Sequence, residues 1–262
     1  MTVKFDKYQG NGNDFIIIDD RHGRFDNSVE TVRKMCDRHF GIGADGLMLV
    51  RKSDAADFEM LYYNSDGALS TMCGNGGRCI AAFAYNHGIA GDKMIFSAVD
   101  GLHRAVINKK TGDHTYDVSL EMIDVEDHKK EDWFYFLDTG SPHHIMFVND
   151  VKNIDVYENG KKIRYSEMYE PDGTNVNFVQ INGNTIFVRT YERGVEDETL
   201  SCGTGVTASA IATYIKTGKK PERIETTGGN FRVDFNDKNG RFTDIWLKGP
   251  AEMVFKGEIA VP

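Results

Sequence analysis

Cysteine is scarce in this sequence, with four residues among 262. Four cysteines are too few for a disulfide scaffold, and thiols stay reduced in a cytosol. They stand at positions 36, 73, 79 and 202, so the chain has no C-x-x-C pair of the kind that builds a zinc site. We therefore expect four free thiols, each with its own explanation, and no metal ion.

An excess of basic charge and long apolar runs are lacking as well. The 31 Lys and Arg residues face 40 Asp and Glu, giving a net charge of −9 that disfavours binding to the phosphates of nucleic acid. No run approaches the roughly 18 apolar residues of a membrane helix. The first residues, MTVKFDKYQGNGNDF, lack the pattern of a signal peptide. We expect a cytoplasmic protein that binds neither nucleic acid nor a membrane.

Proline is also rare, with five residues against 27 glycines, which favours tight turns over proline-rich linkers. Short runs of β-branched and aromatic residues predict strands along the whole chain. These runs are FIIID from 15, LMLV from 47, FEMLYY from 58, HIMFV from 144, IFVRTY from 186 and DIWLK from 244. KKTGD at 109–113 and NGN at 182–184 predict turns between strands.

Helices are expected in only a few places. Asn27-Ser28 is an N-cap candidate for a first helix. Its apolar face would consist of Val29, Val32, Met35 and Cys36. Cys36 is therefore interpreted as a core residue.

Two segments pair a cysteine with glycines, TMCGNGGRCI at 71–80 and LSCGTGVTAS at 200–209. In the first segment we expect the glycines to be non-helical and an apolar helix to run from Arg78 to Gly88. A similar helix follows Cys202 and ends at Gly218. One cysteine in such a turn is usually structural, but two in matched positions favour catalysis.

The repeated segment predicts an α+β fold (mixed α/β) of two pseudo-symmetric domains. Each domain would be a β-rich layer wrapped around a central buried helix, with the active-site cleft between them. We expect residues 1–118 plus 250–262 to form the N-terminal domain, which holds Cys73, and 119–249 to form the C-terminal domain, which holds Cys202.

The expected chemistry follows from the place of the two thiols. The amino-terminal end of a helix has free N–H groups and partial positive charge, which stabilise a thiolate and bind a carboxylate. A base on one face of a Cα–H carbon and an acid on the other would invert that carbon. The scheme requires no cofactor.

A third glycine motif, GIGADG at 41–46, fits the dinucleotide-binding pattern G-x-G-x-x-G. It follows the polar DRHF and precedes the strand run LMLV, whereas a dinucleotide site needs a strand before it and a helix after it. We therefore do not expect a nucleotide cofactor.

Several motifs together resemble the diaminopimelate epimerase family. They are GNGNDF at 10–15, YNSDG at 63–67, MCGNGGRC at 72–79, SPH at 141–143, TNVNF at 174–178 and YERGVEDETLSCGTG at 191–205. The resemblance implies a PLP-independent epimerase that interconverts LL- and meso-2,6-diaminopimelate for lysine and peptidoglycan precursor biosynthesis. Its substrate would be this small molecule, and a homodimer is left open.

The resemblance also implies roles for matched residues. The proton-transfer thiols would be Cys73 and Cys202, with His143 assisting the first and Glu192 the second. Helix-mouth amides for the reacting carboxylate would come from Gly74, Asn75, Gly203 and Thr204. The non-reacting end of the substrate would be bound by Asn13, Asn64, Asn175, Glu192 and Arg193.

Two positions depart from the family pattern: this chain has Ser141 where many relatives have asparagine, and Gly46 where some have glutamine. The serine retains a hydroxyl for a hydrogen bond at the distal end of the substrate site. Two other functions stay open, a proline racemase or related isomerase, and a noncatalytic thiol-based redox or carboxylate-binding protein.

Overall fold

The computed structural model describes residues 2–70 and 73–260, which fall into two compact units. Unit 1 takes residues 1–120 and 249–262, and unit 2 takes 121–248. Residues 1, 71, 72, 261 and 262, which belong to the predicted N-terminal domain, lie outside the described residues. Each unit is described by itself.

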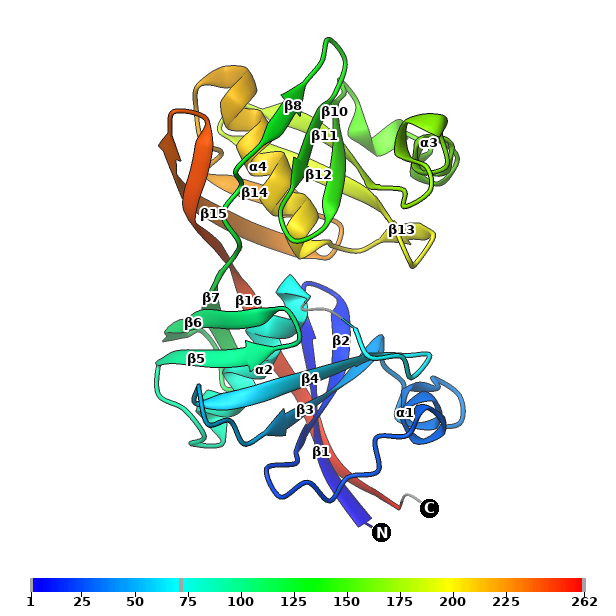
Figure 1. The fold of residues 1–262 in the computed structure, drawn as a ribbon, viewed down its shortest axis with the longest axis vertical. Coiled ribbons are helices and arrows are strands. Elements are labelled where there is room, and N and C mark those ends of the chain that lie inside the picture. Colours follow the sequence, from blue (N-terminus) through cyan, green and yellow to red (C-terminus); the bar gives the residue numbers. More distant parts are fainter. Residues whose placement is uncertain (1, 71–72, 261–262) are drawn as a thin grey trace. The chain divides into compact units, whose positions relative to one another are not determined.

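Unit 1 is a strand layer that closes on itself around a helix (Figure 1). Its strands are β1 (Thr2–Gly10), β2 (Asn13–Asp19), β3 (Gly46–Arg51), β4 (Phe58–Asn64), β5 (Lys93–Ala98), β6 (Gly101–Lys110), β7 (Thr115–Glu121) and the end of β16 (Arg241–Ala260). They pair in that order, and β16 also pairs with β1, which closes the layer. Two neighbouring pairs, β2 with β3 and β4 with β5, are parallel.

Each parallel pair of unit 1 needs a crossover helix. Helix α1 (Val29–Cys36) connects β2 to β3, and α2 (Gly74–Asn86) connects β4 to β5. Helix α2 packs against β1, β2, β3 and β6, and Gly74 to Ala84 are all buried. The strands β2 and β3 are therefore covered on both faces, which explains their unbroken apolar runs.

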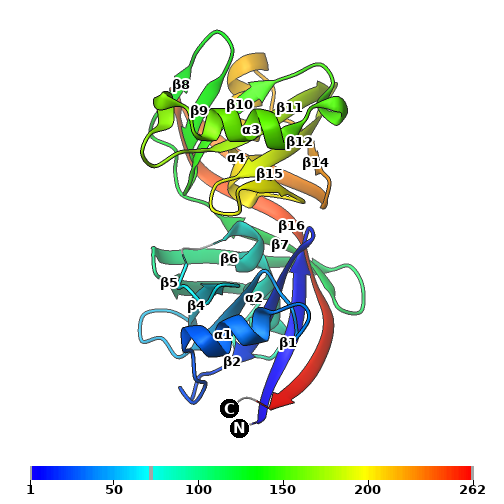
Figure 2. The same ribbon diagram turned by 90° about the vertical axis from the view of Figure 1, so that its right-hand side faces the viewer.

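Unit 2 repeats this plan (Figure 2). Its strands are β8 (His128–Lys130), β9 (Tyr135–Asp138), β10 (Pro142–Phe147), β11 (Asn175–Asn182), β12 (Thr185–Glu192), β13 (Asp197–Thr199), β14 (Arg223–Thr226), β15 (Gly229–Lys238) and the start of β16. Its helices are the short η1 (Val151–Asn153), α3 (Val156–Arg164), η2 (Glu167–Tyr169) and α4 (Gly203–Thr217). The parallel pairs are β10 with β11 and β12 with β14, and the crossovers are α3 and α4.

The two units thus share one topology, in which a peripheral helix is followed by a central one. The predicted α+β class with two pseudo-symmetric parts is confirmed. The six predicted strand runs lie in strands, except that Val148 at the end of HIMFV lies just past β10, and both predicted turns separate paired strands. In GIGADG, Gly46 begins β3 and no helix follows, as expected.

Two details of the helix predictions are wrong. Val29 is the first residue of α1 and is 59 % exposed, although Ser28 is the N-cap and Val32, Met35 and Cys36 are buried. The glycines after Cys73 are helical, because α2 begins at Gly74 instead of at Arg78.

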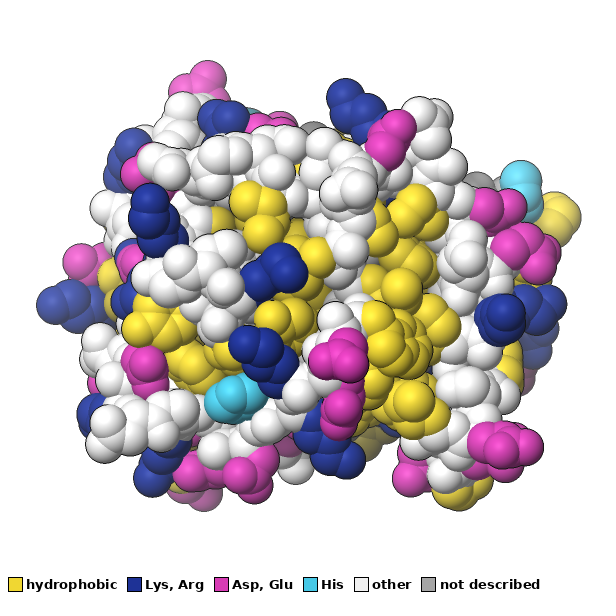
Figure 3. Space-filling view, turned by 90° about the horizontal axis from the view of Figure 1, so that it is seen from above, with side chains coloured by type: hydrophobic (Ala, Val, Ile, Leu, Met, Phe, Trp, Pro, Cys, Tyr) yellow, Lys and Arg dark blue, Asp and Glu magenta, His cyan; other side chains and the backbone are white. Residues whose placement is uncertain are grey.

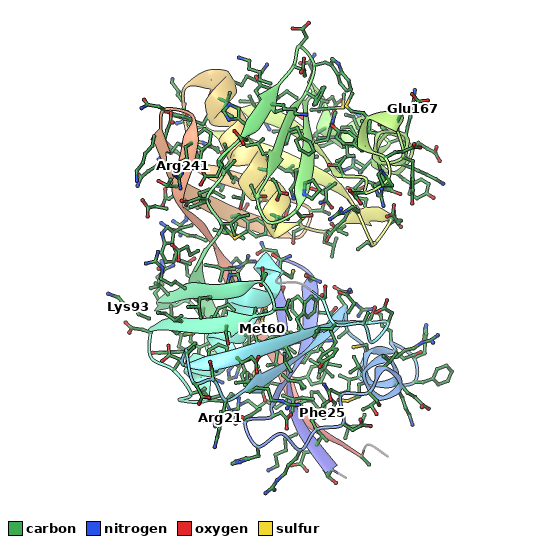
Figure 4. All side chains as sticks on the ribbon, in the orientation of Figure 1. Arg21, Phe25, Met60, Lys93, Glu167 and Arg241 are labelled. Atoms are coloured by element: carbon green, nitrogen blue, oxygen red, sulfur yellow. The ribbon has the colours of Figure 1, made fainter. Side chains whose placement is uncertain are left out.

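The core of unit 1 includes a cluster between α1 and the sheet. Val32, Met35 and Cys36 of α1 pack with strand residues such as Ile16 and Leu47. In Figure 4 the buried Phe25 and Met60 lie within this unit, and Lys93 projects from β5.

Over 2–70 and 73–260, no helix has the length and apolar character to cross a membrane.

Candidate active site

Cys73 is the N-cap residue of α2 in unit 1. Its thiol Sγ donates to Asn13 Oδ1 at 3.5 Å, and Asn13 Nδ2 donates to Asp45 Oδ2 at 2.6 Å. Asn13 begins β2, so the thiol is tied to the sheet edge where β2 starts. The structure thus brings Cys73, Asn13, Gly74 and Asn75 to one helix mouth.

Behind Asn13 lies a cluster of charges that sequence reasoning missed. Arg38 donates to both carboxylates, reaching Asp14 Oδ1 and Asp45 Oδ1 at 2.7 Å each, and Lys7 Nζ lies 2.7 Å from Asp14 Oδ2. Burial opposes ionisation of Asp14, but hydrogen bonds and charge from Arg38 and Lys7 outweigh it and lower its pKa to about 2. The cluster fixes the loop edge on which Asn13 stands.

Arg78 is a fully buried cation one turn into α2. Its guanidinium donates to Asn11 Oδ1 at 2.8 Å, to Asn75 Oδ1 at 3.0 Å and to the Gly74 carbonyl at 3.1 Å. Its Nε also donates to the Pro250 carbonyl at 3.4 Å. Burial lowers the pKa of Arg78 to about 10, so it stays protonated at neutral pH. A positive charge is therefore fixed beneath the helix mouth of Cys73.

Asn64 is the last residue of β4 and is exposed. It pairs with Gly46, whose other neighbour in the sheet is Phe15 of β2. Because β2 and β3 start and β4 ends at the same edge, Asn64 and Asn13 lie at one edge of the sheet, two strands apart. A Cβ on Gly46 would come within 2.5 Å of the Tyr62 ring and 2.6 Å of the Tyr63 carbonyl oxygen, so a glutamine would not fit at this position without a shift of the backbone.

Cys202 is the N-cap residue of α4 in unit 2, as Cys73 is of α2. Its Sγ lies 3.3 Å from Thr204 Oγ1, and Thr204 Oγ1 lies 2.9 Å from His143 Nε2. His143 is completely buried, and burial, with a smaller contribution from the charge of Arg193, lowers its pKa to about 3. The imidazole is therefore neutral at physiological pH.

Gly205 allows α4 to approach β11 closely. A Cβ on this glycine would lie 2.5 Å from Asn177 Oδ1 and 3.3 Å from His143 Cε1. Gly76 is the matching residue of α2, and among the described residues the nearest atom to a Cβ there would be Met48 Sδ at 3.4 Å. Glycine is thus a tight requirement at position 205 and not at position 76.

Asn175 and Arg193 of unit 2 are joined by a hydrogen bond. The Asn175 amide donates to Ser141 Oγ at 2.8 Å and to the Pro142 carbonyl at 2.9 Å, and its Oδ1 accepts from the Arg193 backbone N–H at 2.8 Å. The departure at Ser141 therefore places a hydroxyl in direct contact with Asn175. Arg193 Nη1 also donates to the Asp172 carbonyl at 3.3 Å.

Glu192 ends β12 and is half-buried. Its Oε2 accepts a hydrogen bond from Thr199 Oγ1 of β13 at 2.9 Å. The loop that follows is fixed by Glu196, which accepts from Arg164 Nη2 at 3.2 Å and from the Tyr165 hydroxyl at 2.9 Å. The carboxylate of Glu192 thus lies at the start of a loop that hydrogen bonds to Glu196 hold in place.

Each unit therefore presents a thiol where a buried central helix begins, next to the backbone N–H groups of the first turn. Such a mouth stabilises a thiolate or binds a carboxylate. Among the side chains of 2–70 and 73–260, no group of three or more His, Cys, Asp or Glu is placed to hold a metal ion.

This fold defines a class of α+β proteins with two like halves, each built on one central helix. A phenazine biosynthesis protein of the PhzF family from Bacillus anthracis has the same fold, with a TM-score of 0.78, 15 % identity and 100 % of both chains covered. A hydroxyproline epimerase from Agrobacterium vitis, solved with bound trans-4-hydroxy-L-proline, gives a TM-score of 0.67 at 15 % identity, over 99 % of this chain and 93 % of that one.

Sequence comparison identifies the family within this class. The family model for diaminopimelate epimerase matches residues 5–120 and 135–254, and the chain belongs to this family. The diaminopimelate epimerase of Flavobacterium psychrophilum is 52 % identical over 98 % of this chain and its own full length. That of Aquifex aeolicus is 40 % identical over 98 % of each chain.

Proposed function

We propose that this protein is an isomerase that interconverts LL- and meso-2,6-diaminopimelate, in the synthesis of lysine and peptidoglycan precursors. The observation that supports this most is the repeated site: in a member of this family, Cys73 and Cys202 each cap a buried central helix at the same point of two like units. The family and its named relatives supply the substrate.

The proposed mechanism is a proton transfer between two thiol groups. The thiolate of one cysteine removes the Cα proton of the substrate and becomes a thiol, and the thiol of the other gives its proton to the opposite face and becomes a thiolate. The electron pair left at Cα spreads into the carboxylate in between. N–H groups at Gly74, Asn75, Gly203 and Thr204 would stabilise this charge, as in an oxyanion hole. PLP and metal ions have no part in the scheme.

The proposal needs Cys73 and Cys202 to meet in one cleft. We propose two domains, residues 1–118 plus 250–262 and residues 119–249, that close over the substrate. Closure would exclude water and strengthen the charge interactions at Cα.

The remaining predicted residues would bind the distal amino-acid end of the substrate. Arg193 suits its carboxylate, and Asn13, Asn64 and Glu192 offer acceptors to its ammonium group. Both N–H bonds of the Asn175 amide are occupied by Ser141 and Pro142. Asn175 would therefore contribute through the second lone pair of Oδ1 and by orienting Arg193.

His143 and Glu192 are proposed to assist the thiols. The resemblance assigns His143 to Cys73, and within its own unit His143 contacts Thr204 beside Cys202. Because the buried ring is neutral, we expect it to act by hydrogen bonding and not as an imidazolium ion.

We further propose a cytoplasmic location and leave pairing into a homodimer as a prediction. Large apolar side chains are exposed on the surface, Trp133 and Leu102 among them, and Figure 3 shows hydrophobic patches between charged side chains on one face. Patches of this kind are what subunit interfaces cover. Analytical ultracentrifugation of the purified protein measures whether it forms a homodimer.

The function is tested with a panel of substrates. Purified protein is incubated with LL-diaminopimelate, L-proline or trans-4-hydroxy-L-proline, and formation of the epimer is followed by chiral chromatography. We expect conversion of diaminopimelate alone. Conversion of proline would establish the racemase alternative, and binding without epimerisation of any of these substrates would establish a noncatalytic role.

A further inference from the structure

Asn177 is a completely buried amide in the middle of unit 2 that no expected role includes. It lies on β11 between Ile145 of β10 and Thr190 of β12. Its Nδ2 is 3.0 Å from His143 Nδ1 and donates to the His144 carbonyl at 3.2 Å, and its Oδ1 accepts from Thr190 Oγ1 at 2.9 Å. All of these partners are buried protein atoms.

The carbonyl of His144 decides which way the Asn177 amide faces. A carbonyl oxygen only accepts, so the amide atom beside it must be the donor Nδ2. If the amide were turned over, Oδ1 would stand 3.2 Å from this carbonyl oxygen, and two acceptors would oppose each other in a buried place. The Thr190 hydroxyl fits either orientation and decides nothing.

The orientation of the amide fixes the tautomer of His143. Since Nδ2 is a donor, His143 Nδ1 must accept, and the single proton of the neutral ring lies on Nε2. Nε2–H then donates to Thr204 Oγ1, 2.9 Å away. The Thr204 hydroxyl is left with its own hydrogen to give to Cys202 Sγ at 3.3 Å.

We propose that Asn177 is a positioning residue that holds His143 as the Nε2–H tautomer, so that a chain of donors runs from Asn177 through His143 and Thr204 to the sulfur of Cys202. This inference rests on the proposed function of Cys202. The chain ends on the sulfur as an acceptor, which favours the thiolate. No proton is transferred along this chain of donors. His143 donates a hydrogen bond, and its Nε2, which already bears a proton, cannot receive one from the thiol.

Nitrogen NMR of the imidazole rings tests the proposal directly. In protein labelled with ¹⁵N-histidine, long-range ¹H–¹⁵N correlations distinguish a protonated from a bare ring nitrogen, and loss of one set of signals in His143→Gln assigns the ring. We expect His143 in the wild type to bear its proton on Nε2 throughout the pH range of activity. A proton on Nδ1 in the folded wild type would overturn the proposal, whatever the variants do.

Two substitutions separate positioning from general packing. Asn177→Asp is close to isosteric but replaces the donor Nδ2 with an acceptor, so His143 should bear a proton on Nδ1, and kcat should fall between about tenfold and a hundredfold. Thr190→Val removes a contact of the same amide but not the His144 carbonyl, so the Nε2–H tautomer and kcat should be retained. A folded Asn177→Asp protein with an unchanged tautomer would contradict the proposal.

Failure of the proposed function and failure of this inference give different results. If the wild type fails to epimerise diaminopimelate, the proposed function fails, and the tautomer of His143 can still be read. If it epimerises diaminopimelate with the proton on Nδ1, the function stands and this inference fails.

Discussion

Cys73 and Cys202 occupy the same place in two units of the same topology, yet the groups beneath them differ in kind. Below Cys73 lies a buried cation, Arg78, and the Asn13 amide is held by charged Asp45. Below Cys202 lies a neutral chain through Thr204 and His143. Arg78 and Thr207 each stand five residues after their cysteine, and each donates to the carbonyl of the first glycine in its helix.

The difference indicates two ways of supporting an anion at a helix mouth. A fixed charge acts at a distance and needs no alignment, whereas a neutral hydrogen-bond chain depends on every tautomer and rotamer along it. We expect the helix mouth of Cys73 to tolerate small changes of packing, and we expect the helix mouth of Cys202 to be disrupted by them.

Replacement of the buried cation should have the largest effect on stability. Arg78→Met fills a similar volume but leaves the acceptors of Asn11, Asn75 and Gly74 without their donor, which should cost about 3 kcal/mol in the free energy of unfolding. Thr207→Val is the matched control in unit 2 and should cost much less, since a hydroxyl bonded to the carbonyl four residues earlier adds little to a helix. Urea unfolding of both variants measures the difference, and equal losses would remove the distinction between the two mouths.

Matched glycine substitutions should differ in sign. Gly205→Ala places a methyl group against Asn177 and should destabilise the protein by about 1–3 kcal/mol. Gly76→Ala has ordinary van der Waals room and should be neutral or stabilise the helix by up to about 1 kcal/mol. Thermal and urea unfolding of the two variants checks this, and a loss at Gly76 as large as at Gly205 would show that both mouths are equally exacting.

The neutral state of the buried His143 ring should also affect how the stability of the protein depends on pH. The folded pKa of His143 is about 3, below its ordinary value of 6.5, so between these pH values the unfolded chain binds a proton that the folded protein does not. Stability is therefore complete above pH 6.5 and falls as the pH drops, by at most about 1.4 kcal/mol per pH unit for this residue. His143→Gln should flatten the urea stability curve between pH 6 and 4, and an unchanged slope would mean that the ring is protonated in the fold.

The sequence alone predicted the architecture and the position of both cysteines, because apolar runs and stop glycines reflect local preferences. It did not predict that Gly74 and Gly76 are helical, because glycine is by itself a poor helix former. At Gly205 the reason for a glycine lies in a neighbouring strand, because the group that excludes a Cβ there is Asn177 on β11.

The residues that support the thiols were missed for a related reason. Arg78 was visible as the one cation at the start of an apolar helix, but its partners Asn11 and Pro250 are distant in the sequence. Asn177 alternates with the buried Val176 and Phe178, which marks it as a polar residue on the other face of β11. Only the fold shows that this face is covered by α4 and His143.

The central claim is that one thiol from each unit acts on opposite faces of the same carbon. Epimerisation of LL-diaminopimelate in D₂O, stopped after a few per cent of conversion and analysed by mass spectrometry, tests it most directly. We predict that the meso product has one deuterium at the inverted carbon while the remaining substrate has none, and that Cys73→Ala and Cys202→Ala form no product although Cys36→Ala does. Product that retains the original hydrogen, or full activity without either thiol, would contradict the account.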